Sequence, residues 1–119
     1  DGLALAKRMN ERMLPGVGFY PVSFVPNGSK YVGERCEGVF ILVLDRQLLR
    51  PVRVGLELAS ALQELYGSQF ALDAAARLFG SRDVLARIKA GEDPGTITAQ
   101  WAPDEDSWRL LRAPYLLYY

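Results

Sequence analysis

Two runs of aromatic and β-branched residues within residues 17–45 predict that this chain forms a sheet. The first run, Val17–Val25, reads as a strand, and Pro21 inside it cannot donate to a ladder, which places it at a sheet edge or a bulge. The second run, Val39–Leu44, is apolar throughout, as is typical of a central strand covered on both faces. We expect a small, mainly antiparallel sheet with strands near 17–25, 31–36 and 39–45.

The rest of the sequence carries helical patterns. Leu5, Met9 and Met13 recur at intervals of four, and Arg50-Pro51 opens the longest periodic stretch, since proline suits the first turn of a helix. Glycines and prolines divide the sequence beyond residue 66 into shorter segments. The predicted fold class is therefore α+β, with the sheet packed against helices near 2–14, 50–66, 71–79, 82–90, 94–101 and 103–113.

The same patterns predict which surfaces are buried. The helix over 50–66 should bury a stripe formed by Val52, Leu56, Ala59, Leu62 and Tyr66. Gly55 lies on that side, which we interpret as a place where helix and sheet pack closely. Near the end of the chain a second stripe, Trp108, Leu111 and Tyr115, and the apolar segment 116–119 should dock on the core or on a partner.

Length and charge limit the classes of protein. A chain of 119 residues forms one domain with a single core, so residues 1–119 are treated as one unit. Lysine and arginine number 14, as do aspartate and glutamate, and no basic stripe is visible, which disfavours a nucleic-acid partner. The longest apolar run, Val39–Leu44, is too short to span a membrane.

The chain is poorly equipped for catalysis. It has no histidine, so the usual general base and imidazole metal ligands are missing, and one cysteine cannot form a CxxC metal site. We expect no catalytic residue, no metal and no cofactor. Glycoside hydrolysis needs two carboxyl groups about 5–10 Å apart. Glu34 and Glu37, three apart on a strand, would point to opposite faces and are better read as solvated. Cys36 is better read as a small buried residue than as a nucleophile.

One polar segment could bind a ligand. Asn27, Ser29, Lys30 and Tyr31 offer an amide, a hydroxyl, an ammonium group and a ring, which suit sugar hydroxyls, an acetamido group or a carboxylate. From chemistry alone an ordinary polar turn between strands is the simpler interpretation. Arg46, Arg50 and Arg53 are available for an ion pair with another domain.

Taken in order, several short motifs resemble one known family. They are Leu14-Pro15-Gly16-Val17, Phe19-x-Pro21-Val22-x-Phe24-x-Pro26, Ser29-Lys30-Tyr31-x-Gly33, Cys36-x-Gly38-Val39, Val43-x-Asp45-Arg46, Arg50-Pro51-Val52-Arg53-x-Gly55-Leu56, Gly91 to Pro94, Trp101-x-Pro103-Asp104 and Tyr115-Leu116-Leu117-Tyr118. This ordered set, which spans nearly the whole chain, resembles the C-terminal domain of the NamZ-type exo-β-N-acetylmuramidases, bacterial enzymes of peptidoglycan turnover and recycling.

The resemblance implies a two-domain enzyme that releases N-acetylmuramic acid from the non-reducing ends of peptidoglycan fragments. Its catalytic carboxylates would lie in a Rossmann-like N-terminal domain absent from this chain, and the present domain would close one side of the cleft. The partners implied are that catalytic domain and muropeptides, with Asn27, Ser29, Lys30 and Tyr31 as substrate contacts. The isolated domain should be inactive.

Two other hypotheses stay open. The chain could be a free-standing peptidoglycan-binding or protein-interaction module without catalysis. It could also be an independent cysteine enzyme, in which case Cys36 would be alkylated rapidly at neutral pH. The resemblance alone suggests a location in the bacterial cell envelope, periplasmic or secreted.

Overall fold

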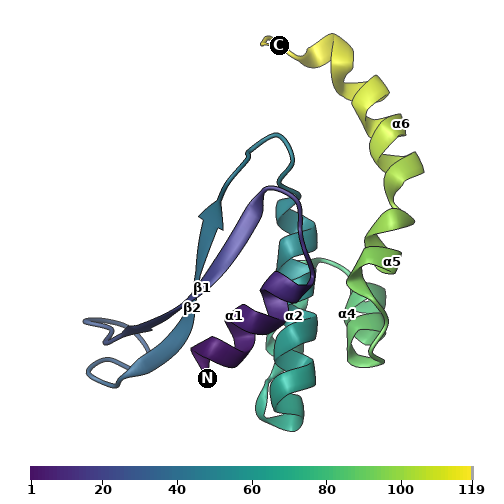
Figure 1. Ribbon diagram of the computed structural model, residues 1–119. Helices are drawn as coiled ribbons and strands as arrows, with labels where there is room; N and C mark the ends of the chain where they lie inside the picture. The colour runs from purple at the N-terminus through teal and green to yellow at the C-terminus, as the bar shows by residue number, and fades with distance from the viewer. Residues whose placement is uncertain (119) are drawn as a thin grey trace.

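The computed structural model describes residues 1–118 and confirms the α+β fold class (Figure 1). Within these residues it has a two-stranded antiparallel sheet and six α-helices, joined by short 3₁₀ turns. The elements are α1 (Gly2–Glu11), β1 (Val17–Phe24), β2 (Cys36–Val43), α2 (Pro51–Tyr66), α3 (Ala76–Phe79), α4 (Arg82–Lys89), α5 (Pro94–Ala99) and α6 (Ala102–Arg112), with 3₁₀ turns at Gly67–Gln69, Leu72–Ala75 and Ala113–Tyr115.

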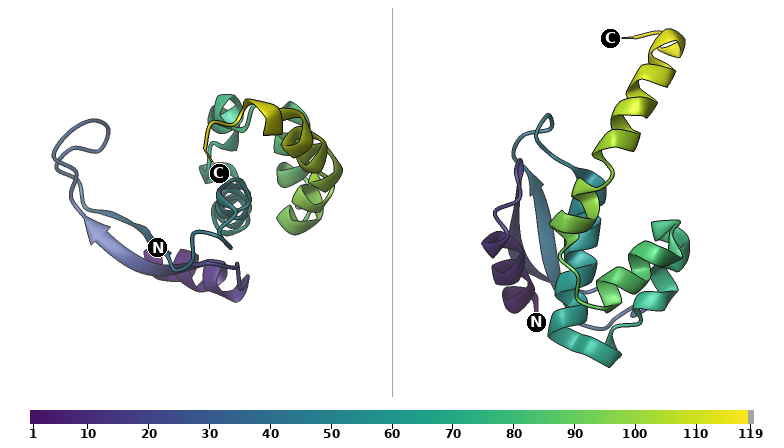
Figure 2. Two further views of the ribbon diagram at one scale, coloured as in Figure 1. Left: turned by 90° about the horizontal axis from the view of Figure 1, so that it is seen from above. Right: turned by 90° about the vertical axis from the view of Figure 1, so that its right-hand side faces the viewer.

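The elements are arranged on the two sides of α2. In Figure 1 and in the left view of Figure 2, the hairpin and α1 lie on one side of α2, and α4, α5 and α6 lie on the other. The tip of the hairpin and the α5–α6 segment are therefore on opposite sides of the molecule. Because α6 extends away from the rest, the chain is elongated, with principal extents of 49 × 32 × 29 Å.

Helix α1 is fixed at both ends. The side chain of Asp1 accepts a hydrogen bond from the Ala4 N–H, as a helix cap does. The helix was predicted to reach residue 14 but ends at Glu11, because Met13 takes a positive φ of 51°. Asn10 exchanges two hydrogen bonds with the backbone of Phe19, at 2.7 and 3.0 Å, and so pairs the free edge of β1 as another strand would.

The sheet is smaller than predicted. The strand expected at 31–36 is absent, because Tyr31 and Gly33 have φ angles of 64° and 77° and form a turn. β2 is therefore not the central strand that its apolar run indicated, and Phe40 to Leu44 are exposed. With two strands both are edges, which confirms the edge position predicted for Pro21; it lies opposite Val39.

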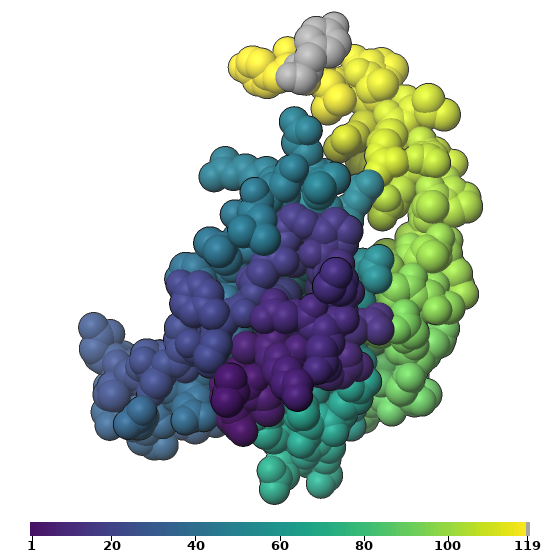
Figure 3. All heavy atoms as spheres, viewed as in Figure 1, coloured from purple at the N-terminus to yellow at the C-terminus, as the bar shows by residue number. Residues whose placement is uncertain are grey.

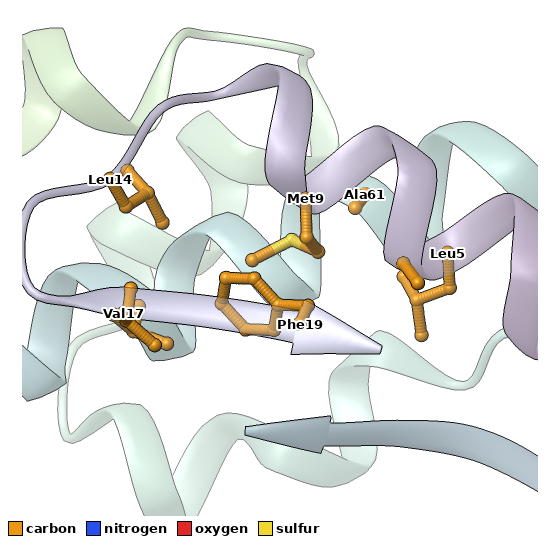
Figure 4. Close-up of a cluster of buried hydrophobic side chains, with 8 residues drawn as sticks. Leu5, Met9, Leu14, Val17, Phe19 and Ala61 are labelled. Carbon is orange, nitrogen blue, oxygen red and sulfur yellow. The ribbon is translucent and has the colours of Figure 1, made fainter. Parts of the chain in front are cut away.

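The first hydrophobic core lies between α1, the inner face of the sheet and α2. Figure 4 shows Met9 of α1 pointing toward Phe19 of β1, with Leu5, Leu14, Val17 and Ala61 around them. Met9 is completely buried. At Gly2, an added Cβ would lie 2.4 Å from the carbonyl oxygen of Gly38, so a glycine is needed for α1 to approach β2 this closely.

The second core lies on the opposite side of α2. Leu56 and Ala59 pack there against Leu72, Leu85, Ile88 and Ile97, which come from the 3₁₀ turn Leu72–Ala75, α4 and α5. Helix α2 is thus buried on two sides rather than along one stripe, and Val52, predicted to be buried, is 66% exposed. The close packing predicted at Gly55 is also wrong, because no atom lies within 4 Å of an added Cβ.

Two apolar surfaces are left uncovered within residues 1–118. On the outer face of the hairpin, Tyr20 stacks on Phe40 with ring centroids 4.9 Å apart, and Phe24 and Leu42 flank them. The predicted stripe of α6 is exposed, since Trp108, Leu111 and Tyr115 keep 58%, 64% and 80% of their surface. Residues 116–118 are exposed as well, and the prediction for Tyr119 lies outside the described residues.

Candidate functional site

The four side chains predicted to bind substrate share one turn at the tip of the hairpin. Asn27, Ser29, Lys30 and Tyr31 are all exposed and lie between β1 and β2. The Lys30 ammonium lies 4.9 Å from the centre of the Tyr31 ring, a cation–π arrangement. The structure therefore brings these groups together on an open surface, which could present them to a partner or to a sugar.

The turn is held by local backbone contacts. The Gly33 N–H donates to the Pro26 carbonyl at 3.0 Å, and the Glu34 N–H donates to the Tyr31 carbonyl at 3.1 Å. Ser29 and Tyr31 both have positive φ, at 66° and 64°, which is uncommon for residues with a Cβ. Such strained positions cluster where a surface serves function, so the turn remains a candidate site.

A second candidate lies beside the start of α2, and we call it the arginine hollow. Its volume is about 370 Å³, and it is lined by Arg50 and Arg53 from the start of α2, Gly95 and Thr98 of α5, Trp101 just beyond α5, and Glu105 of α6. Figure 3 shows open space between the teal atoms that precede α2 and the yellow-green atoms of α6. A neighbouring hollow of about 320 Å³ shares Arg50 and Arg53.

A buried ionic network adjoins the arginine hollow through Arg53, which contacts Glu57. The Glu57 side chain is 2% exposed, and Arg12 donates to both of its carboxylate oxygens, at 2.6 and 3.0 Å. Arg12 also donates to Asp93 at 2.6 Å, so one guanidinium joins the end of α1 to α2 and to the cap of α5. A buried carboxylate is tolerated only when it is paired in this way.

The network shifts the pKa values of Arg12 and Asp93. The hydrogen bonds from Arg12 to Glu57 and Asp93 outweigh the burial of the guanidinium, so the pKa of Arg12 rises above its ordinary value. Burial alone would raise the pKa of Asp93, but hydrogen bonds from Arg12 and from the Thr96 N–H outweigh it and hold that pKa below the usual range. Both groups are thus charged at neutral pH.

Arg53 and Arg50 present their charge to the hollow in different ways. Arg53 lies 3.5 Å from Glu57, a loose contact with a carboxylate that Arg12 already binds twice. Its guanidinium lies directly over Gly95, where an added Cβ would come within 2.9 Å of Nη2. Arg50 is exposed, and within residues 1–118 its guanidinium forms no ion pair or side-chain hydrogen bond.

Sequence reasoning found part of this hollow. Arg50 and Arg53 were predicted to be available for an ion pair, and their spacing of three at a helix start places them on neighbouring positions. Trp101 and Glu105 are about fifty residues away along the chain, and no local pattern could join them to the two arginines. Arg12 and Glu57 were missed altogether, because the sequence does not distinguish a charged residue that becomes buried from one that stays in solvent.

The remaining candidates, Glu34, Glu37 and Cys36, lie at or just before the start of β2. Glu34 is exposed and Glu37 is 54% exposed, in agreement with the solvated interpretation. Cys36 is half-buried, less than predicted, and its Sγ lies 3.7 Å from the Glu34 carbonyl. In the described residues 1–118 no group of three His, Cys, Asp or Glu side chains could hold a metal ion, and none of the helices there is long and apolar enough to cross a membrane.

Comparison with known proteins gives three consistent findings. The family model described as "Exo-beta-N-acetylmuramidase NamZ, C-terminal" matches residues 1–118. The peptidoglycan beta-N-acetylmuramidase NamZ of Bacillus subtilis (strain 168) is 29% identical over 117 residues, covering 96% of this chain and 28% of that protein. The crystal structure of a DUF1343 family protein from Bacteroides fragilis has a TM-score of 0.84 at 24% identity, a likeness of fold that covers all of this chain and 33% of the other.

Proposed function

We propose, from the premise that this chain belongs to the family of NamZ C-terminal domains, that it serves as an accessory, cleft-forming domain of an exo-acting β-N-acetylmuramidase. The family match over residues 1–118 carries the proposal, and it confirms the resemblance found in the sequence. The whole enzyme would release N-acetylmuramic acid from the non-reducing ends of peptidoglycan fragments. The catalytic carboxylates would lie in another domain.

The chemistry of the chain supports an accessory role. Retaining and inverting glycosidases need one carboxyl group that can give up a proton and a second that attacks or activates water. The buried carboxylate of Glu57 is held by Arg12, and those of Glu105 and Asp106 are paired with Arg109 at 3.2 and 2.6 Å. Carboxylates engaged in this way are poorly suited to either step.

The exposed apolar surfaces are evidence that the chain contacts a large partner. Tyr20, Phe24, Phe40 and Leu42 form a contiguous outer face on the hairpin, and such faces mark interaction sites in soluble proteins. The Bacillus subtilis relative extends well beyond the matched region, which is 28% of its length. We assign the outer face of the hairpin to contact with the catalytic domain, which we propose lies outside the matched region.

The turn at the hairpin tip keeps its predicted part in this proposal. Asn27, Ser29, Lys30 and Tyr31 would contact substrate or the rim of the cleft, with no metal or cofactor involved. The substrate class and the family's role in peptidoglycan turnover point to the bacterial cell envelope, and we propose that location for the protein.

A hydrolysis assay tests the proposal. This chain alone is expected to leave a chromogenic N-acetylmuramide intact, because the catalytic carboxylates are proposed to lie in another domain. Fused in place of the matched region of the Bacillus subtilis relative, it should restore turnover that the truncated relative lacks. Hydrolysis by the 119-residue chain alone would overturn the accessory role.

The alternative is a free-standing peptidoglycan-binding or protein-interaction module. It predicts affinity for muropeptides without any help to catalysis, so the fusion would be no more active than the truncated relative. The exposed turn favours this alternative only if NMR signals of residues 26–38 shift when muropeptides are added.

A further inference from the structure

Within residues 1–118, contacts of the fold leave part of the anion-binding capacity of the arginine hollow unused. Arg50 forms no ion pair or side-chain hydrogen bond within residues 1–118, although a guanidinium offers five donors in a fixed fork. It lies at the start of α2, three residues before Arg53. Arg53 contacts the buried Glu57 carboxylate only at 3.5 Å, so the two arginines that line this concave surface can together bind a carboxylate or a similar group.

Arg53 is positioned for binding, and its own carboxylate neighbour does not saturate it. Arg12 gives Glu57 two hydrogen bonds of 2.6 and 3.0 Å, whereas the contact between Arg53 and Glu57 is 3.5 Å. The absence of a side chain at Gly95 allows the Arg53 guanidinium to lie over α5. The guanidinium is thereby held at the wall of the hollow, which lowers the entropic cost of using it.

Two further lining residues, Trp101 and Glu105, have the chemistry of a sugar site. Trp101 is half-buried and offers an aromatic surface, and the Glu105 carboxylate can accept hydrogen bonds from hydroxyl or amide groups. Glu105 is partly neutralised by Arg109 at 3.2 Å. A ligand with a carboxylate for the two arginines and hydroxyl groups for Glu105 would use both sets of lining residues.

The size of the hollow narrows the ligand further. Ligand pockets commonly measure about 300–1,000 Å³, and about 370 Å³ is at the small end of that range. A volume of this size suits one sugar unit with a short substituent. The hairpin turn lies on the far side of the molecule, so one unit cannot touch both places (Figure 1).

We propose that the arginine hollow binds a single carboxylate-bearing amino sugar unit, with the carboxylate on Arg50 and Arg53 and the ring against Trp101. The identity of the sugar rests on the proposed function, because N-acetylmuramic acid carries a lactyl carboxylate. In peptidoglycan the same chemistry has a second source, the carboxylate of a stem peptide attached through that lactyl group.

The test uses the 119-residue chain and three probes, with binding measured by NMR. N-acetylmuramic acid should shift the backbone signals of Arg50 and Arg53 and the indole N–H signal of Trp101. N-acetylglucosamine, which lacks the carboxylate, should bind with an affinity at least about tenfold lower, because a charge-assisted hydrogen bond is lost. Muramyl dipeptide, whose free carboxylate lies in the peptide, distinguishes the two sources: tighter binding than the sugar acid assigns the hollow to the peptide carboxylate.

Variants locate the site. Arg50→Gln should weaken binding of N-acetylmuramic acid about tenfold, while Arg82→Gln, at an exposed arginine of α4, should leave it unchanged. The inference would be overturned by equal binding of the two sugars to the unmodified chain. It would also be overturned by shifts confined to residues 27–31, or by no shift at high ligand concentration. None of these results would affect the accessory role, which fails only if the chain alone hydrolyses substrate or the fusion stays inactive.

Discussion

The hairpin turn and the arginine hollow are built in opposite ways. Asn27, Ser29, Lys30 and Tyr31 are consecutive or nearly so, and backbone hydrogen bonds within residues 26–34 hold them. The hollow joins residues from α2, α5 and α6, and it is supported by a buried network that reaches α1. The turn can therefore change without disturbing the fold, whereas the geometry of the hollow depends on the packing beneath it.

The difference concerns how a binding surface responds to mutation. A turn that makes few tertiary contacts tolerates substitution, so its role must be measured by binding. A surface formed by three separate elements loses its shape when any of them moves. Changes beneath the hollow should therefore affect stability and ligand binding together.

The largest effect is expected from Arg12→Met, which removes the principal partner of buried Glu57. Removing one member of a buried ion pair costs about 3–5 kcal/mol, and Arg53 at 3.5 Å compensates only in part. Urea denaturation measures the loss in the free energy of unfolding. Arg8→Met is the matched control: Arg8 donates to Glu64 at 2.7 and 3.0 Å on the surface, and its loss should cost no more than about 1 kcal/mol. Equal losses would contradict the buried network.

Ile97→Ala should have a comparable or smaller effect. Ile97 of α5 is completely buried in the second core, and truncation of such a residue costs about 2–5 kcal/mol. Because α5 forms one wall of the hollow, binding of N-acetylmuramic acid should weaken as well. Unchanged binding in a destabilised but folded variant would show that the hollow is independent of the core beneath it.

Gly33→Ala tests the local rigidity of the turn. Gly33 has a φ of 77° with open space around it, so the cost is backbone strain of about 1–2 kcal/mol. Gly28→Ala is the control, because Gly28 has neither a positive φ nor a close neighbour, and the free energy of unfolding should change by less than about 0.5 kcal/mol. If Gly33→Ala is equally silent, the turn is not held in one conformation.

The smallest effect is expected from Asp93→Asn, which keeps a capping side chain for α5 but removes the charge facing Arg12. The folded-state pKa of Asp93 is lowered, so its stabilisation is present above the ordinary value of 3.8 and is lost as pH falls through the folded pKa. Because Asp93 is 48% exposed, the difference at pH 7 should be at most about 0.5 kcal/mol. Thermal unfolding of both proteins between pH 7 and pH 2 should show the difference vanishing in acid; a gap that persists there would assign the effect to the cap instead.

Much of the fold was predictable from local signals. The helix starts are visible in the sequence as proline or capping residues. Helix α2 begins at Pro51, and α4 and α5 begin directly after Ser81 and Asp93. The strand at 31–36 and the buried face of α2 were predicted wrongly. The strand is absent because Tyr31 and Gly33 adopt positive φ angles, which the pattern of residues 31–36 did not reveal. The face of α2 was predicted wrongly because an apolar pattern does not reveal which surface other elements cover.

The sequence by itself determined the α+β class, the position of each main helix, the grouping of Asn27, Ser29, Lys30 and Tyr31, and, through its ordered motifs, the family. These depend on residues close together in the chain, where backbone preferences and spacing act directly. The tertiary structure alone decided that Arg12 pairs with Glu57 and that Arg50, Arg53 and Trp101 line one hollow. Such contacts depend on how helices pack across long separations, and the electrostatic cost of an unpaired buried charge then fixes which partners meet.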